Sequence, residues 1–255
     1  MFELLRQNEG FISRSREILS RLIEFNETGP GIKRLQRGLE TVSAALILGE
    51  RLLADLYFQK YVEDCKLFLT DKPLMERELC DMGYCQDDYA GGVYLAVCYG
   101  IYVSILLDLR EVMEEIALSA DSHPIQQCIG PCENYLIGFA LGRVEAAENE
   151  RLNSWRGWLD DEIVFEEDKR WTLAVPIARR DQEAFMTELV KQNQERKRKI
   201  LEGITHPFTH WFPDHVLGLE LVTLIYLARR RGLQVDESFS KGYGLYRLSL
   251  ECADE

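Results

Sequence analysis

The chain has 255 residues, of which 46% are hydrophobic and 29% are charged, proportions typical of a soluble globular protein. Its formal net charge of −13 repels nucleic acid and anionic membranes and attracts basic partners, although acidity is also a common solubility device. The 7 cysteines are scattered and odd in number, which argues against a disulfide framework and for a reducing compartment.

No stretch of the sequence suits a membrane or a secretory signal. The first ten residues carry Glu3, Arg6 and Glu9, whereas a signal peptide has an uninterrupted apolar stretch. The longest apolar run, Val93–Leu107, has about 15 residues, and a membrane-spanning helix needs roughly 20. We therefore predict a cytoplasmic protein without membrane contact.

The first part of the chain, residues 2–153, is predicted to consist of helices only. Apolar residues recur at helical spacing up to residue 25, and a Thr-Gly-Pro-Gly break follows. A long helix is predicted from Ile32 to Phe58, with Gly38 and Gly49 inside it; such glycines weaken a helix but allow a neighbouring helix to approach closely. Further helical patterns follow the break at Asp71–Pro73, run from Val93 to Ile116, and extend from Cys132 to Asn153.

Residues 154–170 interrupt this pattern and are predicted to form an acidic, tryptophan-rich loop. Six of the nine residues from 160 to 168 are Asp or Glu. Because the residues of the short run Ile163–Phe165 favour β-strands, one extended segment near residues 162–166 is kept as an alternative. The apolar residues of the tail alternate loosely, so a second extended segment near residues 245–250 is kept as an alternative.

The last third carries the strongest helical signals. Asp181 is a suitable N-cap for a helix that ends in the basic run Arg196–Lys199, where positive charge compensates the helix dipole. From Pro213 onward the chain is apolar on almost every face, with Asp214 as the predicted cap and Gly232 as the left-handed closing residue. A helix that is apolar all round must be buried, so we predict one continuous helix at the centre of the fold.

These elements predict an all-α fold. Residues 1–255 are predicted to form a single domain, a multi-helix bundle around the buried C-terminal helix. Its parts are the N-terminal helices within 2–153, the acidic loop 154–170, and the C-terminal helices within 181–231 with a short tail. No internal repeat or low-complexity linker divides the chain.

Motifs for catalysis and metal binding are incomplete. His206 and His210 have the spacing of the two histidines in H-E-x-x-H, but Pro207 stands where the motif requires glutamate. Cys128 and Cys132, with His123 nearby, lack a fourth candidate ligand for a structural zinc ion. The sequence also has no phosphate-binding glycine loop and no nucleophile elbow. We predict a protein that is not an enzyme and has no cofactor, metal or catalytic residue; an enzyme that uses carboxylates or the histidine pair is the alternative.

The acidic loop is the candidate binding site. Tryptophans often anchor protein interfaces, and clustered carboxylates attract basic surfaces. The competing interpretation is a solvated loop whose tryptophans fold inward. On the first interpretation, the interface residues are Trp155, Trp158, Asp160, Asp161, Glu162, Glu166, Glu167 and Asp168.

Two stretches of the last third resemble the immunity protein 49 family. They are AVPIARRDQEAFMTELV (174–190) and VLGLELVTLIYLARRRGLQVD (216–236). The family often continues into a tyrosine–proline step, which this chain lacks. The matching positions are packing and capping residues, namely Ala178, Asp181, Phe185, Leu189, Leu219, Leu224, Ala228, Arg231, Gly232 and Val235.

This resemblance implies an all-α cytoplasmic protein from a bacterial polymorphic-toxin or contact-dependent competition system. Such immunity proteins bind and neutralise a cognate toxin domain, by steric and electrostatic blocking of an active-site surface that is often basic. The expected partner is therefore a toxin or effector protein and not nucleic acid, and a homodimer is left open. The alternative function is a generic helical protein–protein interaction or regulatory module without a toxin.

Overall fold

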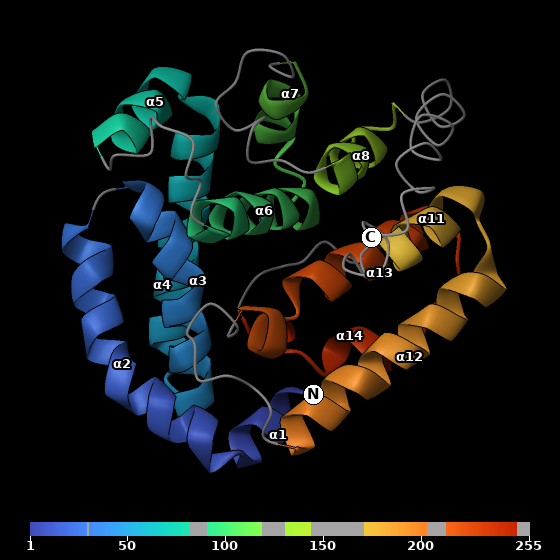
Figure 1. Ribbon diagram of the computed structural model, residues 1–255, viewed down its shortest axis with the longest axis horizontal. Coiled ribbons are helices and arrows are strands. Elements are labelled where there is room, and N and C mark those ends of the chain that lie inside the picture. Colours follow the sequence, from blue (N-terminus) through green and yellow to red (C-terminus); the bar gives the residue numbers. More distant parts are fainter. Residues whose placement is uncertain (30, 82–90, 119–130, 144–170, 203–212, 249–255) are drawn as a thin grey trace.

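A computed structural model describes residues 1–29, 31–81, 91–118, 131–143, 171–202 and 213–248 (Figure 1). Every regular element in these ranges is a helix or a helical turn, and none of their residues lies in a strand. The predicted all-α, multi-helix fold is therefore confirmed. None of the helices in these ranges is long and apolar enough to cross a membrane.

The N-terminal half is built around α3. This helix packs against both α2 and α4, and residues 38–47 are buried without interruption. Asn8 separates the first two helices and caps α2, because its side chain accepts hydrogen bonds from the backbone N–H groups of Gly10 and Phe11. The helices of this half are α1 (Phe2–Gln7), α2 (Glu9–Thr28), α3 (Gly31–Leu48), α4 (Arg51–Thr70) and α5 (Lys72–Asp81).

The apolar helix α6 joins the two halves of the molecule. Figure 1 shows it lying across the molecule, with the N-terminal helices on one side and α13 on the other. Its residues 96–106 are buried, as expected for a helix that has no polar face. The helices here are α6 (Gly91–Leu106), α7 (Arg110–Leu118) and α8 (Pro131–Ala140).

The C-terminal half places α13 against α6, with α11, α12 and the tail around it. The predicted cap is confirmed, because the Asp181 carboxylate accepts a bond from the Ala184 N–H at the start of α12. The elements are α11 (Trp171–Arg179), α12 (Gln182–Leu201), the π-helical turn η3 (Pro213–Leu217), α13 (Leu219–Arg230), α14 (Ser238–Lys241) and the 3₁₀ turn η4 (Gly244–Arg247).

The buried C-terminal helix is confirmed, but its predicted continuity is wrong. The chain breaks at Gly218, which has φ +66° and ends η3 by donating to the Pro213 carbonyl over 2.9 Å. Asp214 consequently lies in η3 and does not cap α13, which starts at Leu219. Gly232 closes the helix at φ +87°, as predicted.

Other predicted helices are also divided, including the one expected up to residue 25, which Asn8 separates into α1 and α2. The helix expected over residues 32–58 ends at Leu48, because Gly49 has φ +84° and turns the chain back into α4. The helix expected over residues 93–116 is interrupted at Asp108, which has φ +48°. Gly38 stays inside α3 and does allow a close approach: a Cβ there would lie 2.8 Å from Cδ2 of Tyr61 on α4.

Two local differences concern the ends of the acidic loop and the tail. Residues 171–179 form α11, which includes Pro176 and was not expected from the sequence. The extended alternative near 245–250 is not found where the structure describes it, since Gly244–Arg247 is a 3₁₀ turn and only Leu248 has extended backbone.

The two ends of the described chain are joined. The Phe2 N–H donates to the Gly242 carbonyl over 2.6 Å, and the Arg247 guanidinium pairs with the Glu3 carboxylate. On the other side of α1, the Asn8 side chain donates to the Ile200 carbonyl at the end of α12. These contacts fix α1 between the C-terminal tail and α12.

Candidate interaction site

The interface residues predicted from the sequence lie outside the described residues. All eight, from Trp155 to Asp168, fall in the range 144–170, and the His206–His210 pair falls in 203–212. Cys132 and His215 are described, and both are buried. In the described part of the chain, no group of three or more His, Cys, Asp or Glu side chains is arranged to hold a metal ion.

A cleft lies between α2, α3 and α4. Its volume of about 280 Å³ is at the low end for small-molecule pockets, which enclose roughly 300–1,000 Å³. A space of this size suits one long side chain of a partner better than a substrate with its cofactor. The cleft is lined by Asn26, Glu27, Arg34, Gly38, Tyr57, Lys60, Tyr61, Glu63 and Asp64.

A two-point ion pair holds one wall of the cleft. Arg34 of α3 donates from Nε and Nη2 to the two carboxylate oxygens of Asp64 on α4, over 3.3 and 3.1 Å. The same guanidinium lies 5.7 Å from the centroid of the Phe68 ring. Because both its hydrogen bonds and its flat face are engaged, Arg34 is a structural element of the wall.

The opposite wall joins α2 to α4 through Tyr57. Its hydroxyl donates to Glu27 Oε1 over 3.3 Å, and the Lys60 ammonium lies 4.8 Å from the centroid of its ring. Burial, followed by the charge of Glu27, raises the pKa of the Tyr57 phenol, so the neutral donor is the relevant form. The carboxylates of Glu27 and Glu63 remain exposed, and the lining carries three carboxylates against two cations.

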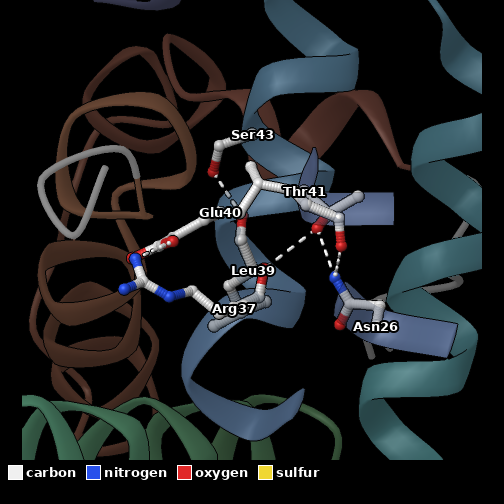
Figure 2. A network of polar contacts seen from close by, with 7 residues as sticks. Asn26, Arg37, Leu39, Glu40, Thr41 and Ser43 are labelled. Atoms are coloured by element: carbon white, nitrogen blue, oxygen red, sulfur yellow. Dashed lines mark hydrogen bonds and ion pairs between the residues drawn. The ribbon is translucent and has the colours of Figure 1, made fainter. Parts of the chain in front are cut away.

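Asn26 lines the cleft and is held by the hydrogen bonds drawn in Figure 2. Its side-chain amide donates to the Thr41 hydroxyl over 2.6 Å and to the Leu22 carbonyl over 2.7 Å. Thr41 is fully buried and donates in turn to the Arg37 carbonyl within α3. This chain of bonds ties α2 to α3 beside the cleft.

The remaining polar groups in Figure 2 point away from Asn26. Glu40 is buried and accepts a hydrogen bond from Arg37 Nη1 over 2.8 Å, and the Ser43 hydroxyl donates to the Leu39 carbonyl. Every one of these polar side chains has a partner, which is what burial inside a helical layer requires. They stabilise the helical layer, and we assign them no role in binding.

Exposed leucines accompany the cleft along α4. Leu52 is 86% exposed, Leu56 is 47% exposed and Leu67 is 46% exposed. At 100° per residue these positions lie within about 60° of one another around α4, and they share that face with Glu63 and border Lys60. The outer face of α4 therefore combines an apolar row with the carboxylates at the mouth of the cleft.

These cleft and leucine residues were missed in the sequence. The cleft brings together side chains from three helices whose packing no spacing rule encodes. The leucines did leave a signal, because Leu52, Leu56 and Leu67 fall outside the buried stripe defined by Ala54, Tyr57, Phe58, Tyr61, Cys65, Phe68 and Leu69.

The charge state of Asp64 gives a direct test of this geometry. Partial burial raises the pKa of its carboxyl, and the hydrogen bonds and charge of Arg34 act in the opposite direction. We expect NMR titration to give a pKa above that of an ordinary aspartate, and Arg34→Met to raise it further. The folded chain then holds this proton more tightly than the unfolded chain, so the contribution to stability is present at low pH. It is lost as the pH rises through the folded pKa. A lower pKa in the variant would contradict the described pairing.

Comparisons with known proteins identify no relative. No family model, no curated protein and no solved structure matches the chain. Function must therefore be argued from the residues themselves.

Proposed function

We propose that this protein is a toxin-neutralising binding protein of the immunity type. It acts by docking onto a basic surface of a cognate toxin domain and blocking that surface sterically and electrostatically. The observation that carries the proposal is the outer face of α4, where exposed Leu52, Leu56 and Leu67 lie beside an acidic cleft. The resemblance of residues 174–190 and 216–236 to the immunity protein 49 family supplies the toxin as the partner.

The cleft fits one basic side chain of the partner. A lysine or arginine can lay its methylene groups against Tyr57 and Leu56 and bring its charge to Glu27 and Glu63, which are both exposed. The leucines would supply the apolar contact that anchors an interface, while the carboxylates select for positive charge. The net charge of −13 would accelerate encounter with such a partner.

The acidic loop remains part of the proposal as a second contact region. Its six carboxylates between residues 160 and 168 suit the same basic surface. A variant with Asp160, Asp161, Glu166 and Glu167 changed to lysine is expected to bind the toxin more weakly and with less dependence on salt. Affinity that does not change at low salt would remove the loop from the interface.

The deciding experiment pairs this protein with the product of the neighbouring gene. Co-expression should rescue cells from that product, and a pull-down should recover the two proteins together. In the same assays, Leu52→Ser combined with Leu56→Ser should weaken binding at least tenfold, because exposed leucines at an interface lose their apolar contact while the fold loses little.

A matched control comes from α12. Leu201 is 65% exposed and lies on another helix, so Leu201→Ser should leave both rescue and affinity unchanged. Equal loss in both variants would rule out α4 as the docking face. Tight binding to a protein that is not toxic would favour the alternative, a generic helical interaction module.

A further inference from the structure

Arginines gather where three helices end. Arg231 joins these ends: its guanidinium lies 4.7 Å from the Phe139 ring centroid of α8 and donates to the Ala178 carbonyl of α11 over 3.3 Å. Arg143 follows Phe139 by one turn, and its backbone N–H folds back onto the Gly138 carbonyl. The cluster comprises Arg143, Arg179, Arg180, Arg229, Arg230 and Arg231.

Two members of the cluster are used within the fold. Arg231 caps the end of α11, and Arg229 donates to the Val235 carbonyl over 3.2 Å and lies near the Asp236 carboxylate. These contacts are the usual use of cations at helix C-termini, where they compensate the helix dipole. These two arginines account for only part of the positive charge of the cluster.

The other four guanidiniums are exposed and engage no carboxylate of the residues that the structure describes. Arg143, Arg179, Arg180 and Arg230 form no ion pair in the described structure, and Arg230 only lies 5.7 Å from the Tyr226 ring centroid. Asp181, beside two of them, is occupied as the cap of α12. Four unpaired arginines in one place are unexpected in a chain with a net charge of −13.

We propose that this arginine cluster is a second docking surface, for a carboxylate-rich segment of a partner protein. Each guanidinium can bind a carboxylate through two parallel hydrogen bonds, a geometry that a lysine cannot reproduce. In Figure 1 α8 and α11 lie across the molecule from α2, α3 and α4, so the cluster at their ends can be occupied together with the cleft. Its occupation does not depend on the proposed docking of a toxin on α4.

The surroundings favour an acidic peptide over nucleic acid. A DNA duplex carries about one negative charge per 1.7 Å of its axis. Beyond the arginine cluster, its phosphates would be repelled by the negative charge of the rest of this protein. Phosphate sites are commonly built on helix N-termini, whereas α8, α11 and α13 present their C-terminal ends here. A short acidic segment needs only the area that the arginines cover.

The test measures fluorescence anisotropy of a labelled oligoglutamate peptide of about ten residues titrated with the full chain at low salt. Binding should weaken as salt is added. Arg179→Gln combined with Arg180→Gln should weaken it at least fivefold, and Arg143→Gln with Arg230→Gln should do the same. Circular dichroism and melting temperature confirm that each variant is folded.

The control replaces two exposed arginines on α2 and α4, Arg21→Gln with Arg51→Gln, which removes the same charge elsewhere. Peptide binding that survives the cluster variants, or falls equally in the control, overturns the proposal. A single-stranded oligonucleotide of equal charge is titrated in parallel. Tighter binding of the oligonucleotide than of the peptide also overturns it.

Discussion

Replacing Gly218 with alanine is expected to lower the free energy of unfolding by about 3 kcal/mol. Two costs add at this position. Gly218 has φ +66°, a backbone conformation that is unfavourable for a residue with a Cβ. A Cβ would also lie 2.2 Å from Cδ1 of Tyr243, whose side chain is itself buried. Because that ring has no space to withdraw, η3 and α13 must shift. Urea unfolding followed by circular dichroism measures the change.

Gly232 is the matched control. It has a similar left-handed backbone, with φ +87°, but nothing lies within 4 Å of the position that a Cβ would take. Gly232→Ala should therefore cost only the backbone term, about 1 kcal/mol. If the two variants lose equal stability, the contact with Tyr243 does not contribute to the loss of stability in Gly218→Ala.

The existence of most helices was predictable from local patterns, although α11 was not expected, and the helix ends were not predictable. Gly38 and Gly49 look alike in the sequence, since each interrupts an apolar stripe that continues on both sides. In the structure Gly38 lies against Tyr61 inside α3, and Gly49 reverses the chain. The difference depends on which helix packs against each glycine, and the periodicity of the sequence does not contain that information.

Capping residues were predicted where the chemistry is local. Asp181 accepts a bond from an N–H three residues later, and Gly232 closes a helix, so neighbouring sequence is sufficient to identify both. Asp214 looked like a cap for the same reason. The turn at Gly218 separates Asp214 from α13, and no local rule predicted that turn.

The candidate cleft depends on three-dimensional packing throughout. Arg34 and Asp64 are thirty residues apart, as are Glu27 and Tyr57, and each pair forms only because α2, α3 and α4 pack together. The sequence instead directed attention to the acidic loop, where many charges are adjacent. Composition reveals such a cluster, but it does not reveal a site assembled from separate helices.

Arg196 shows how a local interpretation can be incomplete. The run Arg196–Lys199 was assigned to dipole compensation, and Arg198 does pair with Glu202 at the end of α12. Arg196 instead turns inward, where it donates to the Asp214 carbonyl over 3.5 Å and pairs with Glu220 over 3.4 Å. It therefore ties α12 to η3 and α13.

The charges around Arg196 form one partly buried cluster. Burial alone would lower the pKa of its guanidinium, but Glu220, Tyr243 and Asp214 raise it. Tyr99 of α6 lies on the other side, where burial and Asp214 raise the pKa of its phenol. Side chains from five segments of the fold thus meet here, namely α12, η3, α13, α6 and the tail, and removing Arg196 takes away the cation with which Glu220 pairs.

Arg196→Met is accordingly expected to lower the free energy of unfolding by about 2 kcal/mol, less than for a fully buried pair because both partners keep some contact with solvent. Glu220→Leu should also be destabilising, and the double variant should lose less than the sum of the two, since it removes both members of the ion pair. Arg198→Met, on the same helix but at the surface, should change stability little. Urea unfolding of the four variants measures these differences. Additive losses from Arg196→Met and Glu220→Leu would show that the two side chains do not interact.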